Sequence, residues 1–511
     1  MKLTQSASRD LWTQHEVPDK YSGLLLGLDV GSSGLKAILL HPAEGIVATH
    51  SVPLDLFSEQ PGWAEADPIE WWSAVCSVVP ALLNDIHCSA SAITAVSVSG
   101  MVPAVVVVDS TGKPLRRAIL QNDARAVREI EFLKEKISDV DLLTLTGSVL
   151  SQQSVSPTIL WLANNESEKY PSISAIMGSY DWIASQLGAE PHVESNWALE
   201  SGLYSIDLEP LPLAQEVTGI QWPRLLDVRH PGDVVGTVSQ RASLETGLQV
   251  GTLIVVGGAD HVLSAYGAGL VNQGDCLVKL GGAGDILVVA DSIHLDRRLY
   301  LDSHPIRGKW MPNGCMATSG SLLRWEQGIM GGASLEDLDA EAASRSPGAL
   351  ISLPYFLGEK TPLHDPDLRG AVIGMHLGTT RGDLHRSFLE AIAYGFKAHF
   401  DVFAEGGVEI TRVRVTNGGS KSRLWRTILA DVLDRELHSI INHPGASFGA
   451  AVIAGIGTGA IDDWAYVKTA LEVGEEIVPN QSNTAIYEEK YQQFLNLGAA
   501  LTPFSHRLAR G

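Results

Sequence analysis

The sequence is poor in cysteine and in long apolar runs, and each shortage excludes a class of protein. Its 511 residues include four scattered cysteines and no CxxC pair, so neither a disulfide scaffold nor a cysteine-rich zinc site is expected. The N-terminus lacks the apolar segment of a secretory signal. No run of about 18 apolar residues is present that could span a membrane. These absences predict a soluble, cytoplasmic protein.

Basic residues are also scarce relative to acidic ones. The chain has 37 Lys and Arg against 59 Asp and Glu, a net charge of −22. We therefore expect neither nucleic acid nor an anionic membrane surface to be its main partner. A nucleotide is not excluded, because backbone amides, a lysine and Mg²⁺ can reverse the field within a small site.

The sequence has no P-loop, but residues 23–40 offer another phosphate site. They read GLLLGLDVGSSGLKAILL, which is typical of a strand, a tight turn and a second strand. The turn offers free N–H groups and small hydroxyls that suit phosphate oxygens. Asp29 at its mouth could hold Mg²⁺, directly or through water. Gly, Ser and Asp also form ordinary hairpin turns, so this stretch alone leaves both interpretations open.

Residues 253–269, LIVVGGADHVLSAYGAG, combine an apolar strand, two glycines and one carboxylate. The strand pattern places Asp260 at its carboxyl end, where open α/β sheets bind ligands. A carboxylate there can accept a proton from a substrate hydroxyl. Asp260 could equally serve only as the N-cap of the following helix.

Two further glycine-rich turns extend this pattern. Residues 274–290, GDCLVKLGGAGDILVVA, repeat the strand, turn and strand of the first hairpin, which predicts two similar halves with a phosphate between them. Asp285 in this hairpin could reach a metal or only shape the turn. Residues 412–433 read as strand, glycine turn and helix, which would bring backbone close to a flat ligand such as adenine.

Two polar segments at predicted strand ends could line a small-molecule pocket. The first is residues 99–103, SGMVP, and the second is residues 122–125, NDAR. The Asp and Arg of the second segment could bind polyol hydroxyls. They could also form a helix cap and a surface pair with each other.

Together these motifs resemble the FGGY family of carbohydrate kinases, most closely its xylulokinase-like members. The resemblance covers nearly the whole chain, and residues 370–390 fit the family's second signature at every position except Phe388. It implies an α/β fold of two actin-like, ribonuclease H-like ATPase domains with a cleft between them. The expected division is a polar leader at 1–22, an N-terminal domain at 23–268, a C-terminal domain at 269–480, and a C-terminal helix and tail at 481–511.

The resemblance also implies a role for individual residues. Asp260 becomes the catalytic base and a sugar contact, and Asp29 lies near Mg²⁺. The residues expected to bind ATP and its phosphates are Gly31, Ser32, Ser33, Lys36, Gly281, Gly282, Gly418, Gly419 and Ser420. The other residues expected to bind the sugar are Ser99, Met101, Val102, Asn122 and Asp123.

The chain departs from the family pattern mainly around the sugar. Residues 99–104 read SGMVPA where xylulokinases typically show SGQMHG, and Thr158 replaces the lysine of the first signature. In the second hairpin, Gly281-Gly282-Ala283 replaces Gly-Thr-Ser, which leaves only backbone donors for phosphate.

The resulting expectation is an enzyme that uses ATP and Mg²⁺ to phosphorylate a hydroxyl of a small sugar. D-Xylulose, giving D-xylulose 5-phosphate, is the best match to the resemblance. The alternatives are a kinase for another ketose, a polyol or a sugar acid, and a non-catalytic actin-like sensor of sugar and ATP. A homodimer is an expectation at the level of the family.

Overall fold

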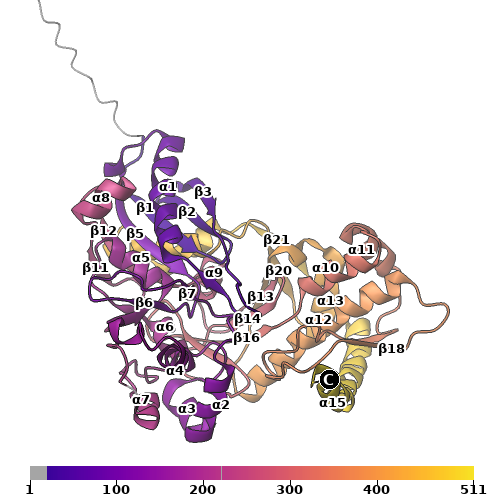
Figure 1. Ribbon diagram of the computed structural model, residues 1–511. Coiled ribbons are helices and arrows are strands. Elements are labelled where there is room, and N and C mark those ends of the chain that lie inside the picture. The colour runs from indigo at the N-terminus through magenta and orange to yellow at the C-terminus, as the bar shows by residue number, and fades with distance from the viewer. Residues whose placement is uncertain (1–19, 220, 511) are drawn as a thin grey trace, which may run out of the picture.

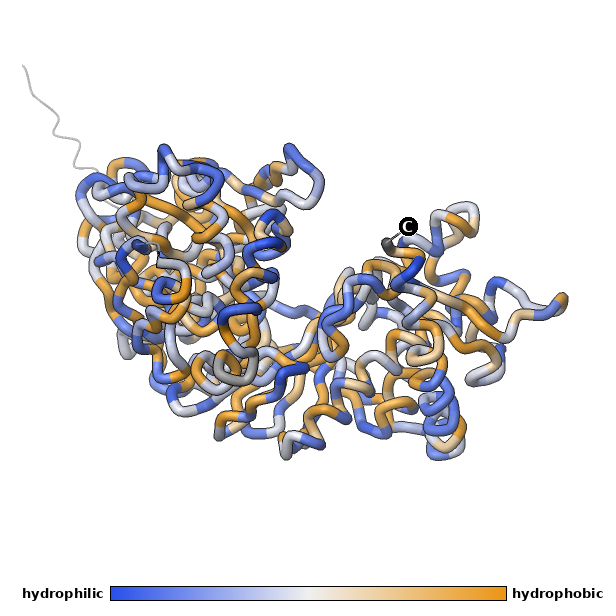
Figure 2. Tube along the Cα trace, turned by 60° about the horizontal axis from the view of Figure 1, so that its bottom comes forward, coloured by the Kyte–Doolittle hydropathy of each residue, from blue (hydrophilic) through white to orange (hydrophobic). Residues whose placement is uncertain are grey.

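Two large mixed β-sheets organise the chain into two lobes, which lie side by side in Figure 1. The computed structural model describes residues 20–219 and 221–510. The predicted leader, residues 1–22, therefore lies almost wholly outside the described residues. Figure 2 shows a narrow waist between the lobes and apolar residues gathered inside each of them, as expected for two hydrophobic cores.

The first sheet has six strands and the second has seven. In spatial order, the first sheet contains β11 (Val234–Thr237), β12 (Leu253–Ala259), β5 (Ile93–Gly100), β1 (Leu24–Val30), β2 (Gly34–His41) and β3 (Gly45–Pro53). The second contains β15 (Tyr300–Ser303), β16 (Trp310–Met316), β14 (Gly284–Val288), β13 (Asp275–Leu280), β19 (Arg412–Thr416), β20 (Leu437–Ile440) and β21 (Val473–Ile477).

Both sheets follow one plan. An antiparallel hairpin lies at the centre of each, β1–β2 in the first and β13–β14 in the second. Parallel strands extend the sheet on the other side of the hairpin, through β5 and β12 in the first and through β19 and β20 in the second. The repeated plan confirms the prediction of two similar halves.

Helices and short strands cover these sheets. The helices before the second sheet are α1 (Pro68–Ile86), α2 (Val127–Lys136), α3 (Asp139–Thr146), α4 (Val155–Asn165), α5 (Ser179–Leu187), α6 (Ser195–Ser201), α7 (Leu213–Thr218), α8 (Gln240–Thr246) and α9 (Asp260–Gly267). Those that follow are α10 (Gly320–Ile329), α11 (Leu335–Ala343), α12 (Arg381–Glu405), α13 (Arg423–Leu433), α14 (Ala446–Thr458) and α15 (Gln481–Arg510). The short strands are β4 (Glu65–Ala66), β6 (Val106–Val108), β7 (Ala118–Ile119), β8 (Ala175–Met177), β9 (Val193–Glu194), β10 (Val228–Arg229), β17 (Ile351–Leu353) and β18 (Ala371–Ile373). Within residues 20–219 and 221–510, no helix combines the length and apolar character needed to cross a membrane.

Helix α14 packs on the first sheet although it follows most of the second in the chain. Its buried residues share one hydrophobic core with strands β1, β2, β5 and β12. On β1, a Cβ added at Gly27 would lie 1.9 Å from the backbone oxygen of Ser447, so strand and helix approach too closely for any side chain. The sequence division had placed residues 446–458 with the C-terminal domain. Their small and apolar side chains cover the first sheet, so this part of the expected C-terminal domain packs on the first lobe.

The strand order brings polar residues to one edge of the first sheet. Asp29 on β1 lies opposite Ser99 on the parallel strand β5 and opposite Lys36 on the antiparallel strand β2. Asp260 follows β12 directly and begins α9. Since β1, β5 and β12 are parallel, their carboxyl ends meet at the same edge.

Candidate active site

A cavity of about 860 Å³ lies between the two lobes, at the carboxyl ends of central strands from both sheets. The first lobe contributes Asp29 from β1 and Asp260 from the start of α9. The second lobe contributes Lys279 from β13 and Thr416 from β19. We call this space the inter-lobe cavity. It brings together the two carboxylates that the sequence singled out.

Asp29 is a carboxylate largely withdrawn from solvent. Burial raises its pKa to about 7, and the neighbouring Asp260 adds to this effect while Lys36 and Lys279 oppose it. Its Oδ1 atom is buried and has no hydrogen-bond partner among the described residues. A carboxylate oxygen with unused lone pairs suits a hard cation such as Mg²⁺, so the residues present fit the metal role expected for Asp29.

Asp260 does not act as the N-cap that the sequence left open. Helix α9 begins at Asp260 itself, and its cap position is Ala259. The side chain is 36% exposed, and its Oδ1 accepts a hydrogen bond from the backbone N–H of His261 at 2.6 Å. The carboxylate is therefore held by its own helix while its surface remains open to the inter-lobe cavity.

Lys36 brings positive charge to the same place. Its Nζ donates a hydrogen bond to the backbone oxygen of Pro444 at 3.1 Å. A Cβ added at Gly445, the residue before α14, would lie 3.6 Å from this Nζ atom. The ammonium group therefore lies at the N-terminus of a 13-residue helix, whose free N–H groups also attract anions.

Lys279 is a second cation, which the sequence analysis missed. On β13 it lies opposite Asp285, with Nζ 3.1 Å from Oδ2. Burial lowers the pKa of Lys279, but the carboxylates of Asp285 and Asp260 outweigh burial, and the net shift is upward. The sequence does contain a signal for Lys279. The first hairpin pairs Asp29 on its first strand with Lys36 on its second strand. The second hairpin has the same pair in reverse order, with the lysine on its first strand and the aspartate on its second.

The turn of the first hairpin stands beside these groups. Its backbone is closed by a hydrogen bond from Gly31 N to Gly34 O at 3.0 Å. Ser32 and Ser33 are exposed, so their hydroxyls are accessible to a ligand. This arrangement retains the small donors that the sequence predicted for phosphate.

A second cavity of about 960 Å³ adjoins the first, since Asn417 and Lys421 line both. Apolar side chains from five elements form part of its wall, among them Leu280, Leu389 and Trp425. Four of the five glycines expected at ATP also line it, namely Gly281, Gly282, Gly418 and Gly419. Ser420 lines the inter-lobe cavity, although its hydroxyl donates to Asn417 O at 2.7 Å. Two joined cavities of this kind fit a ligand with one flat end and one charged end.

Gly419→Ala is expected to weaken both the fold and ATP binding. A Cβ at this position would lie 2.3 Å from Cζ3 of Trp425 and 2.7 Å from Cβ of Leu280, and both side chains are buried. Such overpacking costs about 1–3 kcal/mol, which urea unfolding would measure.

Gly418→Ala is the matched control for this variant. An added Cβ there meets no heavy atom of the described residues within 4 Å. We expect it to retain the unfolding free energy of the wild type. Equal losses of unfolding free energy in both variants would contradict the assignment of Gly419 as the residue in close contact.

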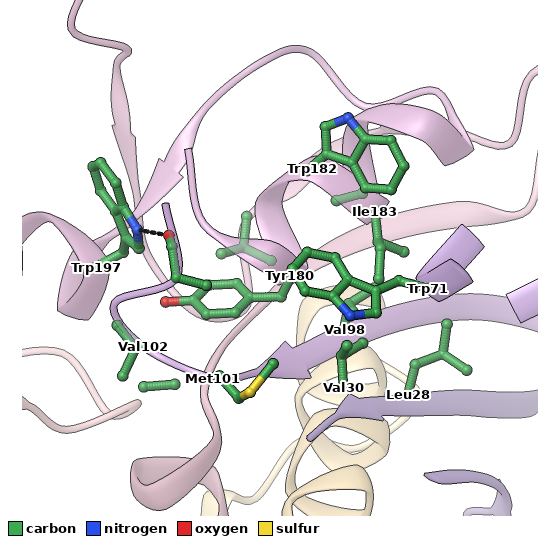
Figure 3. Close-up of a cluster of buried hydrophobic side chains, with 14 of the residues drawn as sticks. Leu28, Val30, Trp71, Val98, Met101, Val102, Tyr180, Trp182, Ile183 and Trp197 are labelled. Carbon is green, nitrogen blue, oxygen red and sulfur yellow. Dashed lines mark hydrogen bonds between the residues drawn. The ribbon is translucent and has the colours of Figure 1, made fainter. Parts of the chain in front are cut away.

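The segment expected to touch sugar is largely buried. Figure 3 shows Met101 and Val102 packed in a hydrophobic cluster with Tyr180 and Val30. Their exposed fractions are 1% and 5%. Both side chains therefore belong to the core, and a contact between them and sugar stays a prediction. Ser99 is also buried, and its Oγ has no hydrogen-bond partner in the part of the chain that the structure describes.

The second expected sugar segment forms a buried ion pair. Asp123 accepts hydrogen bonds from Arg125 Nε at 2.8 Å, from Arg125 Nη2 at 2.7 Å and from Ala64 N at 2.6 Å. Arg125 also contacts Glu65 at 2.7 Å and stacks on the ring of Trp63. The oxygens of Asp123 thus already have partners, whereas the neighbouring Asn122 is exposed.

His385 adds a charged group to the wall of the second cavity. Its ring nitrogens lie 2.7 Å from Glu326 Oε2 and 2.9 Å from Asp339 Oδ1. Burial lowers the pKa of His385, but the hydrogen bonds to Asp339 and Glu326 outweigh it and raise the pKa to about 9. The protonated ring therefore stabilises the folded state through this buried contact.

The stabilisation by His385 should depend on pH. Because the folded pKa exceeds the unfolded value of 6.5, the contribution is fully present below about pH 6.5 and is lost as pH rises through about 9. We expect the difference in unfolding free energy between wild type and His385→Gln to shrink by on the order of 2 kcal/mol across this window. Urea unfolding at both ends of the window measures it, and a difference independent of pH would contradict the charged pairing.

Comparison with known proteins agrees with this geometry. The model of the FGGY family of carbohydrate kinases, N-terminal domain, matches residues 24–267, and that of the C-terminal domain matches residues 297–458. The chain belongs to the FGGY family of carbohydrate kinases. The predicted fold is thereby confirmed as the two-domain, actin-like fold of these sugar kinases, which use ATP to phosphorylate an alcohol group.

Relatives of this FGGY kinase match over nearly their full length. Xylulose kinase of Staphylococcus epidermidis is 28% identical over 488 residues, which cover 92% of this chain and 95% of the relative. The L-xylulose/3-keto-L-gulonate kinase of Escherichia coli is 27% identical over 501 residues, with 94% and 98% covered. The crystal structure of xylulose kinase from Rhodospirillum rubrum is 36% identical and has a TM-score of 0.89, with 94% and 100% covered.

Proposed function

We propose that this FGGY kinase transfers the γ-phosphate of Mg-ATP to a hydroxyl of D-xylulose, giving D-xylulose 5-phosphate, in the cytoplasm. The observation that carries the proposal is the inter-lobe cavity itself, where Asp29, Asp260 and Lys279 converge. The adjoining cavity supplies a place for adenosine. The xylulose kinase relatives support the choice of sugar.

The chain's own residues divide the work of transfer. Asp260 accepts the proton of the attacking hydroxyl, because its carboxylate is partly exposed at the cavity. Lys36 and Lys279 approach the cavity from opposite lobes and offset the negative charge of the transferring phosphate. Phosphoryl transfer depends chiefly on such positioning and charge neutralisation.

Asp29 would hold the Mg²⁺ ion of this site. Its unpaired, buried Oδ1 is the observation that supports this role. When bound, Mg²⁺ neutralises phosphate charge. Burial disfavours the ionised form of the Asp29 carboxylate. A bound cation would offset this cost, so the burial of Asp29 favours a cation at this position.

The position of Lys36 supports a phosphate at the start of α14. A cation near the positive end of a helix dipole is unfavourable by itself. An anion between the ammonium group and the free N–H groups of the helix reverses that repulsion. We therefore assign the terminal phosphate of ATP to the space beside Gly445, which lines the inter-lobe cavity.

Another sugar is the first alternative, and one observation favours it. Met101 and Val102 replace the polar residues of the xylulokinase pattern, and the structure buries both. The E. coli relative named for L-xylulose and 3-keto-L-gulonate shows a similar level of identity. A non-catalytic sensor is disfavoured, because Asp29, Lys36 and Asp260 are all retained at the cavity.

A panel of ketoses, polyols and sugar acids tests the proposal. ADP release from Mg-ATP is measured with each compound and compared with release in the absence of sugar. We expect D-xylulose to give the largest kcat/KM. A higher kcat/KM for another sugar would replace the substrate but retain the kinase, whereas sugar binding without ADP release would favour the sensor.

A further inference from the structure

We propose that His261 is a positioning residue that holds the Asp260 carboxylate and is itself fixed from the second lobe by Asp302. The inference rests on the proposed role of Asp260 as proton acceptor. It adds a residue through which the second lobe acts on the base of the first. Sequence reasoning missed His261, because its partners lie far away in the chain.

The His261 ring lies between a carboxylate of the second lobe, Asp302, and one of the first lobe, Asp260. Its Nε2 lies 2.7 Å from Asp302 Oδ2 on strand β15. Its Nδ1 lies 3.6 Å from Asp260 Oδ1, the same oxygen that its backbone N–H contacts at 2.6 Å. The 2.7 Å separation is that of a hydrogen bond, so a proton and not a metal ion joins the ring to Asp302.

Asp302 is itself held rigidly. It is 1% exposed, and its Oδ2 also accepts a hydrogen bond from Asn313 Nδ2 at 2.7 Å. The next residue, Ser303, exchanges hydrogen bonds with Asn196 of α6 through its backbone N–H at 2.7 Å and its backbone oxygen at 3.1 Å. These bonds fix β15 of the second sheet against the first lobe. The position of the His261 ring therefore follows the position of this strand.

Four carboxylates lie around the His261 ring. They are Asp260 on α9, Glu200 on α6 at 4.0 Å, Asp302 on β15 and, farther off, Asp285 on β14. Burial lowers the pKa of His261, but these carboxylates outweigh burial and raise the pKa well above its ordinary value. The ring is thus an imidazolium with one N–H toward Asp302 and the other toward Asp260.

This arrangement explains how a partly exposed carboxylate keeps one orientation. The His261 ring and its backbone N–H both lie beside Oδ1 of Asp260, which leaves Oδ2 for the sugar hydroxyl. When the lobes move, Asp302 carries the ring with it, so the base is set for transfer only in the arrangement that keeps this contact.

His261→Asn tests the proposal, with His50→Asn as the matched control. The control removes a histidine whose side chain is 41% exposed and whose ion-pair partner is Asp85. With the sugar that supports turnover, we expect His261→Asn to lower kcat about 10-fold to 100-fold and to leave the KM for ATP unchanged. The kcat/KM for the sugar should fall together with kcat, because the Asp260 carboxylate loses the group that orients it.

Asp302→Asn removes the carboxylate that links His261 to the second lobe and keeps the histidine ring. Without the buried carboxylate the pKa of His261 falls, and activity should decline as pH rises above it. Selective ¹⁵N labelling of histidine reads the same change without any assay of turnover. The wild-type ring should stay protonated well above its ordinary pKa of 6.5, whereas the ring in Asp302→Asn should titrate at a clearly lower pH than in the wild type.

Each outcome decides the question. A His261→Asn enzyme with wild-type kcat, or with a KM for ATP raised as much as kcat is lowered, overturns the positioning role. A wild-type ring that is neutral at about pH 7 by NMR overturns it as well. Wild-type protein without sugar-dependent ADP release is a separate result, which overturns the proposed function. Retained ATP binding shows that each variant is folded.

Discussion

Replacement of Asp260 by Asn is expected to lower kcat by about 10² to 10⁴ and to leave ATP affinity nearly unchanged. Loss of a general base costs a rate factor of this size. Asn has the same shape and can keep the hydrogen bond that the His261 N–H donates to Oδ1 at 2.6 Å. The second cavity, which we propose for adenosine, is lined by other residues, including Gly418 and Trp425. Steady-state kinetics and calorimetric titration with ATP measure the two effects.

Asp85→Asn serves as the control for this variant. The Asp85 carboxylate on α1 is 57% exposed. Among the salt bridges of the described residues, its one partner is His50, whose Nδ1 lies 3.9 Å from Asp85 Oδ2. Its kcat should equal that of the wild type. A kcat of Asp260→Asn within about threefold of the wild type would contradict the role of Asp260, since it lies far outside the expected range.

Lys36→Met is expected to lower kcat by about 10² to 10³. Removing one group that stabilises developing charge has an effect of this size. The variant keeps most of the side-chain volume but deletes the Nζ atom that contacts Pro444 O at 3.1 Å. The free N–H groups at the N-terminus of α14 then offset the phosphate charge without the neighbouring ammonium group. We also expect a raised KM for ATP, because the ammonium group meets phosphate in the ground state too.

Lys169→Met is the matched control, since the Lys169 side chain is 60% exposed, lies beyond the end of α4 at Asn165 and lines neither cavity. It should keep the kcat and KM of the wild type. If Lys36→Met changed only the KM for ATP, Lys36 would bind the nucleotide without stabilising the transition state. If neither constant changed, the placement of phosphate beside α14 would be wrong.

Local patterns predicted the parts of this site that lie within a few residues of each other. The two hairpins, the strand before Asp260 and the turn at Gly418 all formed where expected. Strand alternation and glycine turns depend on neighbouring residues, so the sequence contains that information directly. The order of these motifs was enough to indicate the family.

Features that depend on packing could not be obtained in this way. Met101 and Val102 follow a strand end, like many binding residues, yet the core of the first lobe covers them. Helix α14 crosses to the first sheet because Gly27 leaves room for it. The contact between His261 and Asp302 joins residues 41 positions apart. Such relations arise from the three-dimensional arrangement and leave no periodic signal in the chain.

Phosphorus NMR of the complete reaction tests the central claim most directly. Wild-type enzyme is incubated with Mg-ATP and the preferred sugar, and the products are followed by ³¹P resonance, with Asp260→Asn as the blank. We predict that a sugar phosphate and ADP appear in equal amounts in the wild type alone. ADP with inorganic phosphate in place of sugar phosphate, or identical spectra for wild type and variant, would contradict transfer to sugar with Asp260 as its base.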